Sequence, residues 1–225
     1  PGAWTLSPSP TGYQTLDKSV LVQSDHHHTL SLSLSPTYTP STDPMKLDLL
    51  FVVDNSGSMQ PKQERLAKAL PRYMSALLAF KMQLDLRVGV ISTDIGAGTT
   101  YSDSSCVYLG ERGKLIKRAS KAGCPLPSDD YIAVNYDIQG RPQSNVTGDK
   151  VVEAFSCMVQ LGSHGCGFEQ PLGALRQAIA PGVNPGFLRK DAALGIVILT
   201  DEDDCTAASD KLFDPSQQGL NDPLG

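Results

Sequence analysis

The chain has 225 residues, a length that allows one sizeable hydrophobic core with a smaller appendage. With 40% apolar residues and no apolar run of about 18 residues, no membrane-spanning helix is predicted. A net charge of −5 without a Lys/Arg cluster argues against nucleic acid as a partner.

Residues 1–46 are rich in Ser, Thr and Pro, which predicts a β-strand arm and a linker outside the main core. Residues 29–35 alternate strictly between polar and apolar, as in a half-buried strand, and residues 20–22 are the predicted hairpin partner. Residues 39–44 are the predicted linker. Because the chain opens with Pro1 and not Met, we expect that any leader has been removed.

Residues 47–225 alternate strand and helix patterns, which predicts an α/β fold with a mainly parallel sheet. Residues 95–147 are too long for a structureless loop, so we expect this insertion to hold a short hairpin. Helical spacing predicts that Leu66, Leu70, Tyr73 and Leu77, and then Leu172, Leu175 and Ile179, point inward. Strands are predicted over 48–53, 84–91 and 193–200, and helices over 61–79, 148–160 and 169–180.

Five cysteines without zinc-type spacing predict disulfides and an extracytoplasmic location: secreted, at the cell surface or periplasmic. We expect Cys106 to pair with Cys124, closing the insertion, and Cys157 to pair with Cys166. Cys205 would be left over. The alternative is five buried free thiols.

A carboxylate and two hydroxyls follow the apolar run at residues 49–53 as Asp54, Ser56 and Ser58. On an extended loop, side chains at i, i+2 and i+4 point the same way, so all three can reach one small cation. Mg²⁺ prefers oxygen ligands. Because two of these oxygens are neutral, the ion would retain an affinity for an outside carboxylate. The alternative is that Asn-Ser-Gly-Ser forms only a turn and a helix N-cap.

Two further segments belong beside this loop. The apolar run at residues 193–199 is followed by Thr200 and four consecutive acids. A small-residue loop over 161–165 precedes a helix. Ligands of open α/β sheets gather outside the carboxyl ends of the strands, where Asp94 also falls.

In this order, the three motifs resemble the von Willebrand factor A (vWA) domain and its metal-ion-dependent adhesion site. The phrases FVVDNSGSM, GCGFEQPL and ILTDEDDC more closely resemble exported, cysteine-containing vWA proteins of myxobacteria-like bacteria. The resemblance covers roughly residues 47–206 and implies a Rossmann-like, doubly wound sheet. It also implies an antiparallel edge strand within the insertion, for which residues 131–136 are the candidate. Asp54, Ser56 and Ser58 match the family's first loop, and Asp201 matches its third.

The second loop departs from the family pattern, which has Thr there. Ser163 is the nearest hydroxyl, and Glu169 is the alternative ligand. Asp94 and Asp203 are further candidates that would act through water or replace a ligand. Since the family has two more strand–helix units after the Asp201 strand and 24 residues follow here, we expect the C-terminal part of the fold to be missing.

The resemblance implies a non-enzymatic, metal-dependent protein-binding or adhesion module. An Asp or Glu of a protein ligand or of a neighbouring subunit would complete the coordination of Mg²⁺, Mn²⁺ or Ca²⁺. A lipid anchor upstream of this sequence is compatible with such a module. One alternative is a structural subunit of an extracellular fibre or envelope assembly. Another is a haloacid-dehalogenase-type phosphotransferase with Asp54 as nucleophile, which is disfavoured because Ser56 replaces the second acid.

Overall fold

The structure is a computed structural model. It describes residues 3–5, 19–21, 45–78, 84–97, 106, 110–118 and 122–208, which fall into two compact units, Pro1–Asp43 and Pro44–Gly225. In the first unit, β1 (Ala3–Thr5) pairs antiparallel with β2 (Ser19–Leu21). The predicted strand over 29–35 and the linker over 39–44 lie outside the described residues.

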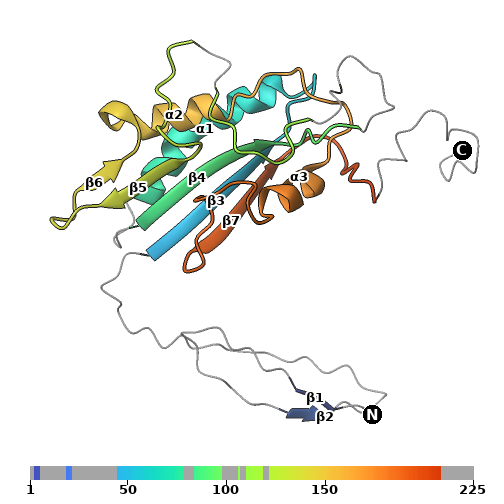
Figure 1. Ribbon diagram of the computed structural model, residues 1–225, viewed down its shortest axis with the longest axis horizontal. Coiled ribbons are helices and arrows are strands. Elements are labelled where there is room, and N and C mark those ends of the chain that lie inside the picture. Colours follow the sequence, from blue (N-terminus) through green and yellow to red (C-terminus); the bar gives the residue numbers. More distant parts are fainter. Residues whose placement is uncertain are drawn as a thin grey trace, which may run out of the picture. The chain divides into compact units, whose positions relative to one another are not determined.

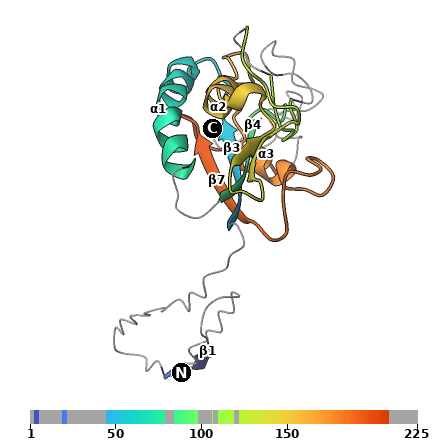
Figure 2. The ribbon, with the colours of Figure 1, turned by 90° about the vertical axis from the view of Figure 1, so that its left-hand side faces the viewer.

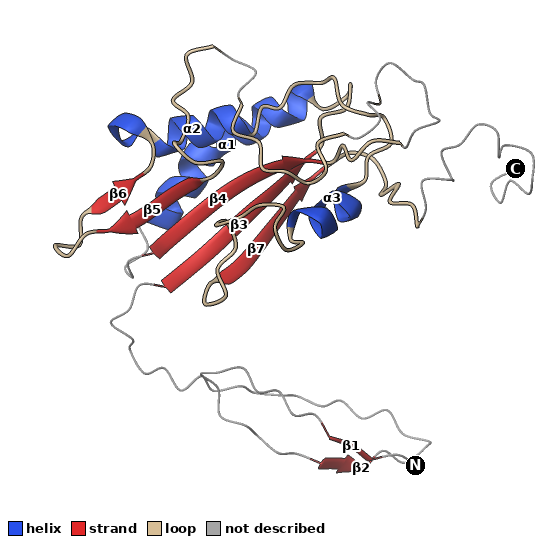
Figure 3. Ribbon diagram, viewed as in Figure 1, coloured by secondary structure: helices blue, strands red, loops and turns tan. Residues whose placement is uncertain are grey.

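The second unit is a mixed α/β fold around a five-stranded sheet with the order β6-β5-β4-β3-β7 (Figures 1 and 3). The strand β3 (Met45–Val53) runs parallel to β4 (Leu84–Ser92) on one side and to β7 (Ala193–Leu199) on the other. The insertion adds β5 (Ile132–Tyr136) and β6 (Pro142–Ser144), both antiparallel to their neighbours. The predicted strands and the inserted hairpin are therefore present, with β6 and not β5 at the edge.

Helices cover both faces of this sheet (Figure 2). The helices α1 (Gln60–Leu78) and α2 (Val151–Met158), the latter preceded by the 3₁₀ turn η1 (Thr147–Asp149), pack on one face, and α3 (Pro171–Ala178) packs on the other. Successive residues of β3 enter the two cores alternately, which explains its continuous apolar sequence. None of the helices within the described residues combines the length and apolar character needed to cross a membrane.

Among the described side chains, three that were predicted to point inward do not, and the side chain of Leu77 lies outside that description. Tyr73 on α1 is 41% exposed, and Leu172 and Ile179 at the two ends of α3 are 52% and 43% exposed. Met74 and Ala174 are fully buried instead. The inward face of α3 carries Ala174 and Ala178, with Leu175 packed against the same core, and Leu172 and Ile179 fall outside this face.

Two disulfides form, but not between the predicted partners. Cys106 pairs with Cys166 and Cys124 pairs with Cys157, whereas Cys205 is an exposed free thiol. The expected pairing of cysteines that are neighbours in sequence was wrong because the fold carries the two cysteines of the insertion to different places. Cys106 meets the loop before α3, and Cys124 meets α2.

Candidate metal site at the carboxyl ends of β3 and β7

The Asp54 carboxylate lies, fully buried, where β3 and β7 end side by side. Its backbone N–H donates to the carbonyl of Leu199 at 2.9 Å, so the chain leaves β3 still paired with β7. Its Oδ1 accepts the backbone N–H of Ser56 at 2.8 Å, and its Oδ2 accepts the hydroxyl of Thr200 at 2.8 Å. Asp54 is therefore held by its own loop and by the loop after β7.

The Ser56 hydroxyl is buried and has no hydrogen-bond partner. The Glu169 carboxyl, itself only 3% exposed, lies near enough for this hydroxyl to lower its pKa, although the two groups do not form a geometrically good hydrogen bond. Burial raises the pKa of Glu169, and repulsion from Asp54 raises it further. Ser56 thus presents an unused oxygen beside two carboxylates.

A second pair of candidate ligands meets at the start of α1. The Ser58 hydroxyl donates to Asp201 Oδ1 at 3.0 Å, and the ammonium of Lys62 lies 2.5 Å from Asp201 Oδ2. Lys62 holds the pKa of Asp201 below its usual range. In the sequence, nothing distinguishes Lys62 from an ordinary helix-surface lysine.

Gln63 joins the first loop to the second. Its side-chain amide donates to the carbonyls of Asp54 at 2.7 Å and Gly162 at 2.8 Å, and its Oε1 accepts the Gly162 N–H at 3.1 Å. Gln63 is buried on the inward stripe of α1, so a polar residue on an apolar face was the signal that would have revealed it. Asn55 adds a backbone bond, accepting the Gly165 N–H at 2.7 Å.

The loop over 161–165 contributes its backbone to this corner more than its predicted side chain. Ser163 is half-buried, and no hydrogen bond joins it to the first loop within the described residues. Gly165 has no room for a side chain, because a Cβ there would lie 2.3 Å from the Asn55 Oδ1. Glu169 is therefore the described second-loop side chain that lies beside Asp54.

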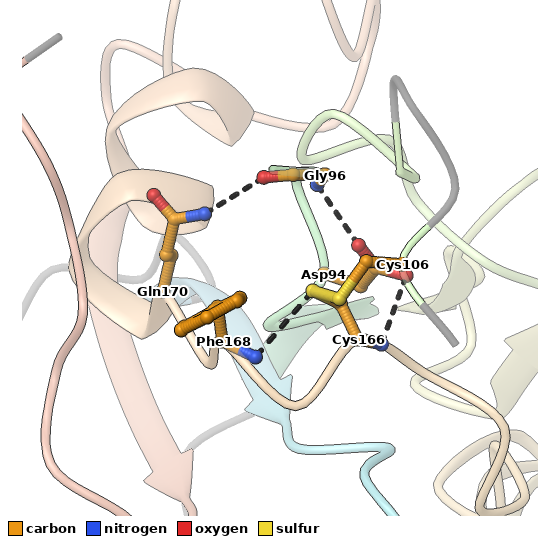
Figure 4. Close-up of a disulfide and its surroundings, with 6 residues drawn as sticks. All are labelled: Asp94, Gly96, Cys106, Cys166, Phe168 and Gln170. Carbon is orange, nitrogen blue, oxygen red and sulfur yellow. Dashed lines mark hydrogen bonds between the residues drawn. A yellow bond between two sulfur atoms is a disulfide. The ribbon is translucent and has the colours of Figure 1, made fainter. Parts of the chain in front are cut away.

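Asp94, at the end of β4, organises the segment that leads to Glu169 (Figure 4). Its carboxylate accepts the backbone N–H of Gly96 at 2.9 Å and that of Cys166 at 3.4 Å, and burial raises its pKa. Cys166 is the residue cross-linked to Cys106. Asp94 thus acts on the site through the backbone of the second loop.

Glu169 is also held from the side of β7. Its carbonyl accepts the backbone N–H of Cys205 at 2.8 Å, and the next residue, Gln170, donates its N–H to the Thr93 carbonyl at 3.2 Å. Asp203 is exposed, whereas its neighbour Asp204 accepts the Leu172 N–H at 3.1 Å and so caps α3. The acids after β7 therefore divide between the candidate site and the helix cap.

Within the described ranges, no three His, Cys, Asp or Glu side chains come together at metal-binding spacing. A cation in this corner would need the serine oxygens as well as the carboxylates, and the unpartnered Ser56 oxygen fits that need. Comparisons with protein-family models, with curated proteins and with solved structures find no match.

Proposed function

We propose that this chain is a non-enzymatic, vWA-like binding module. It holds Mg²⁺, with Mn²⁺ and Ca²⁺ as alternatives, at the carboxyl ends of β3 and β7, and it engages a protein partner through that partner's Asp or Glu. The single observation that carries the proposal is the Ser56 hydroxyl, buried and unpartnered beside Asp54 and Glu169. An unsatisfied buried polar group costs about 1–3 kcal/mol, and a cation would use its lone pair.

The sheet order supports this assignment. The chain passes from β3 to β4 on one side and returns to β7 on the other, so the order reverses beside β3. Ligands of open α/β sheets bind outside the carboxyl ends of the strands at such a reversal. Asp54 and Asp201 lie at the ends of the two strands that flank this point.

Ser56, Ser58 and Glu169 are the residues proposed to ligate the ion directly. Asp54 already accepts hydrogen bonds on both carboxylate oxygens, which suits a role through water. A Glu in place of a second-loop hydroxyl adds a negative charge, so it strengthens cation binding and weakens the demand for a partner's carboxylate.

The two disulfides fit an oxidising environment. We place the module at the cell surface, in the periplasm or outside the cell, where a divalent cation and acidic protein partners are both accessible.

The sharpest test is Ser56→Ala, followed by thermal unfolding in EDTA and in saturating Mg²⁺, Mn²⁺ or Ca²⁺. Without metal, the variant should be at least as stable as wild type, because it loses a hydroxyl that has no partner. Wild type should gain about 2.7 kcal/mol at a metal concentration of about 100 times Kd, and the variant should lose most of that gain.

The matched control is Ser92→Ala, another buried serine at a strand end, whose hydroxyl accepts the Asp94 N–H at 3.3 Å. It should lose stability in EDTA but keep its response to metal. The proposal fails if Ser56→Ala unfolds more easily in EDTA and still responds to metal as wild type does.

A second candidate, a structural subunit of an extracellular assembly, rests on the outer edge of β7. Leu194, Ile196 and Ile198 are 43%, 42% and 41% exposed, and no strand of the described residues pairs with this edge. β7 carries no charge and no proline, the usual protections of an edge strand, whereas β6 is short and begins with Pro142. A defined oligomer that Ile196→Lys dissolves would favour this function, and a monomer would count against it.

A further inference from the structure

We propose that the Lys62 ammonium is an internal competitor for the cation, tethered to the site by the first turn of α1. This inference rests on the proposed metal site and concerns how tightly that site binds. The ammonium lies 2.5 Å from Asp201 Oδ2 and 3.4 Å from the Ser58 carbonyl. Asp201 and Ser58 are both candidate ligands, so the Lys62 ammonium already neutralises the negative charge that would attract a metal ion.

The location of Lys62 runs against the electrostatics of its own helix. The first turn of α1 contains Lys62 and no acidic residue. A helix N-terminus carries partial positive charge and disfavours a cation. The Lys62 ammonium is therefore attracted to this position by the acidic loop after β7, and not by its own helix. A divalent ion would bind beside the same acidic loop.

The ligands are also engaged with one another while Lys62 is in place. Asp201 uses one oxygen for the Ser58 hydroxyl and the other for the ammonium. A divalent ion that uses Ser58 and Asp201 must break this arrangement and displace or tolerate a positive charge a few ångströms away. Repulsion between the two cations in this partly buried corner lowers metal affinity.

Displacement of Lys62 has a direct consequence for binding. Its side chain is 38% exposed, so the released ammonium reaches solvent at the rim of the site. Lys62 thus sets the metal concentration at which the site loads, and it then provides a positive charge near an incoming carboxylate.

The test is calorimetric titration of the intact, disulfide-bonded protein with MgCl₂ and MnCl₂ at fixed ionic strength, for wild type and Lys62→Met. The variant keeps the aliphatic stem but removes the charge. We expect its Kd for metal to fall by about tenfold or more. The matched control is Lys46→Met, because Lys46 makes an ion pair of the same 2.5 Å length with Asp191 near the opposite end of β3. Its Kd should not change.

Thermal unfolding in EDTA adds an independent readout. Lys62→Met should unfold at a lower temperature than wild type, because Asp201 loses its partner, and metal should reverse the order of the two proteins. If wild type binds metal and Lys62→Met binds it no more tightly, the inference is overturned while the metal site stands. If neither protein binds metal, the proposed function falls together with the inference.

Discussion

The two disulfides are predicted to act differently on the candidate site. Cys166 lies three residues before Glu169, and its N–H is held by Asp94. Replacing Cys106 and Cys166 together by Ala should release this segment and weaken metal binding by about tenfold or more, the usual effect of losing a group that orients a ligand. Replacing Cys124 and Cys157 should leave metal binding intact.

Both replacements should cost similar stability. The inner cross-link, Cys124–Cys157, spans 33 residues, and the outer one, Cys106–Cys166, spans 60. Because the inner loop is already closed, the outer cross-link closes only the remaining 27 residues, the difference between the two separations. On the chain-entropy model this contributes about 3.5 kcal/mol, and the 33-residue loop contributes about 3.7 kcal/mol. Each loss should lower Tm by roughly 7–14 °C.

The assay combines thermal unfolding in EDTA with calorimetric Mg²⁺ titration of wild type and the two double variants. Equal losses of stability with metal binding lost only in the Cys106/Cys166 variant would support the reasoning. Equal weakening of metal binding in both variants would refute it, because the effect would then come from general loosening of the fold. Unchanged metal binding in both variants would show that the Cys106–Cys166 disulfide does not position Glu169.

Two further predictions concern charge. Arg189→Met should destabilise the fold by about 3–5 kcal/mol in denaturant unfolding, because the Arg189 Nε donates at 2.8 Å to the buried carboxylate of Asp48 and its Nη1 pairs with Asp85 at 2.6 Å. The control is Arg72→Met, at an exposed arginine, and an equal loss of stability in both variants would contradict this prediction. Burial raises the pKa of Glu169 in the folded state, so the metal-free protein should lose stability as pH rises from about 4.5 through that pKa. Glu169→Gln should remove this loss and be the more stable protein at pH 7 in EDTA, and superimposable pH profiles would argue against it.

Much of the fold was predictable because its signals are local. The apolar run that ends at Val53 is buried on both faces of the sheet, and the alternation of strand and helix patterns placed all three parallel strands within a few residues. The same local pattern placed Asp54, Ser56 and Ser58 at the carboxyl end of β3. Periodicity failed on α3, where Ala174 and Ala178 occupy the inward face and the larger Leu172 is exposed.

The composition of the candidate site was decided by tertiary structure. The sequence by itself offered Ser163 and Glu169 as second-loop ligands, and only the packing of the loop before α3 against the ends of β3 and β4 brought Glu169 beside Ser56. Sequence distance likewise suggested the wrong disulfides. Propensity and periodicity act over one or two turns of chain, whereas loop contacts depend on how whole strands and helices stack. The residues that share a site were therefore settled by packing and not by proximity along the chain.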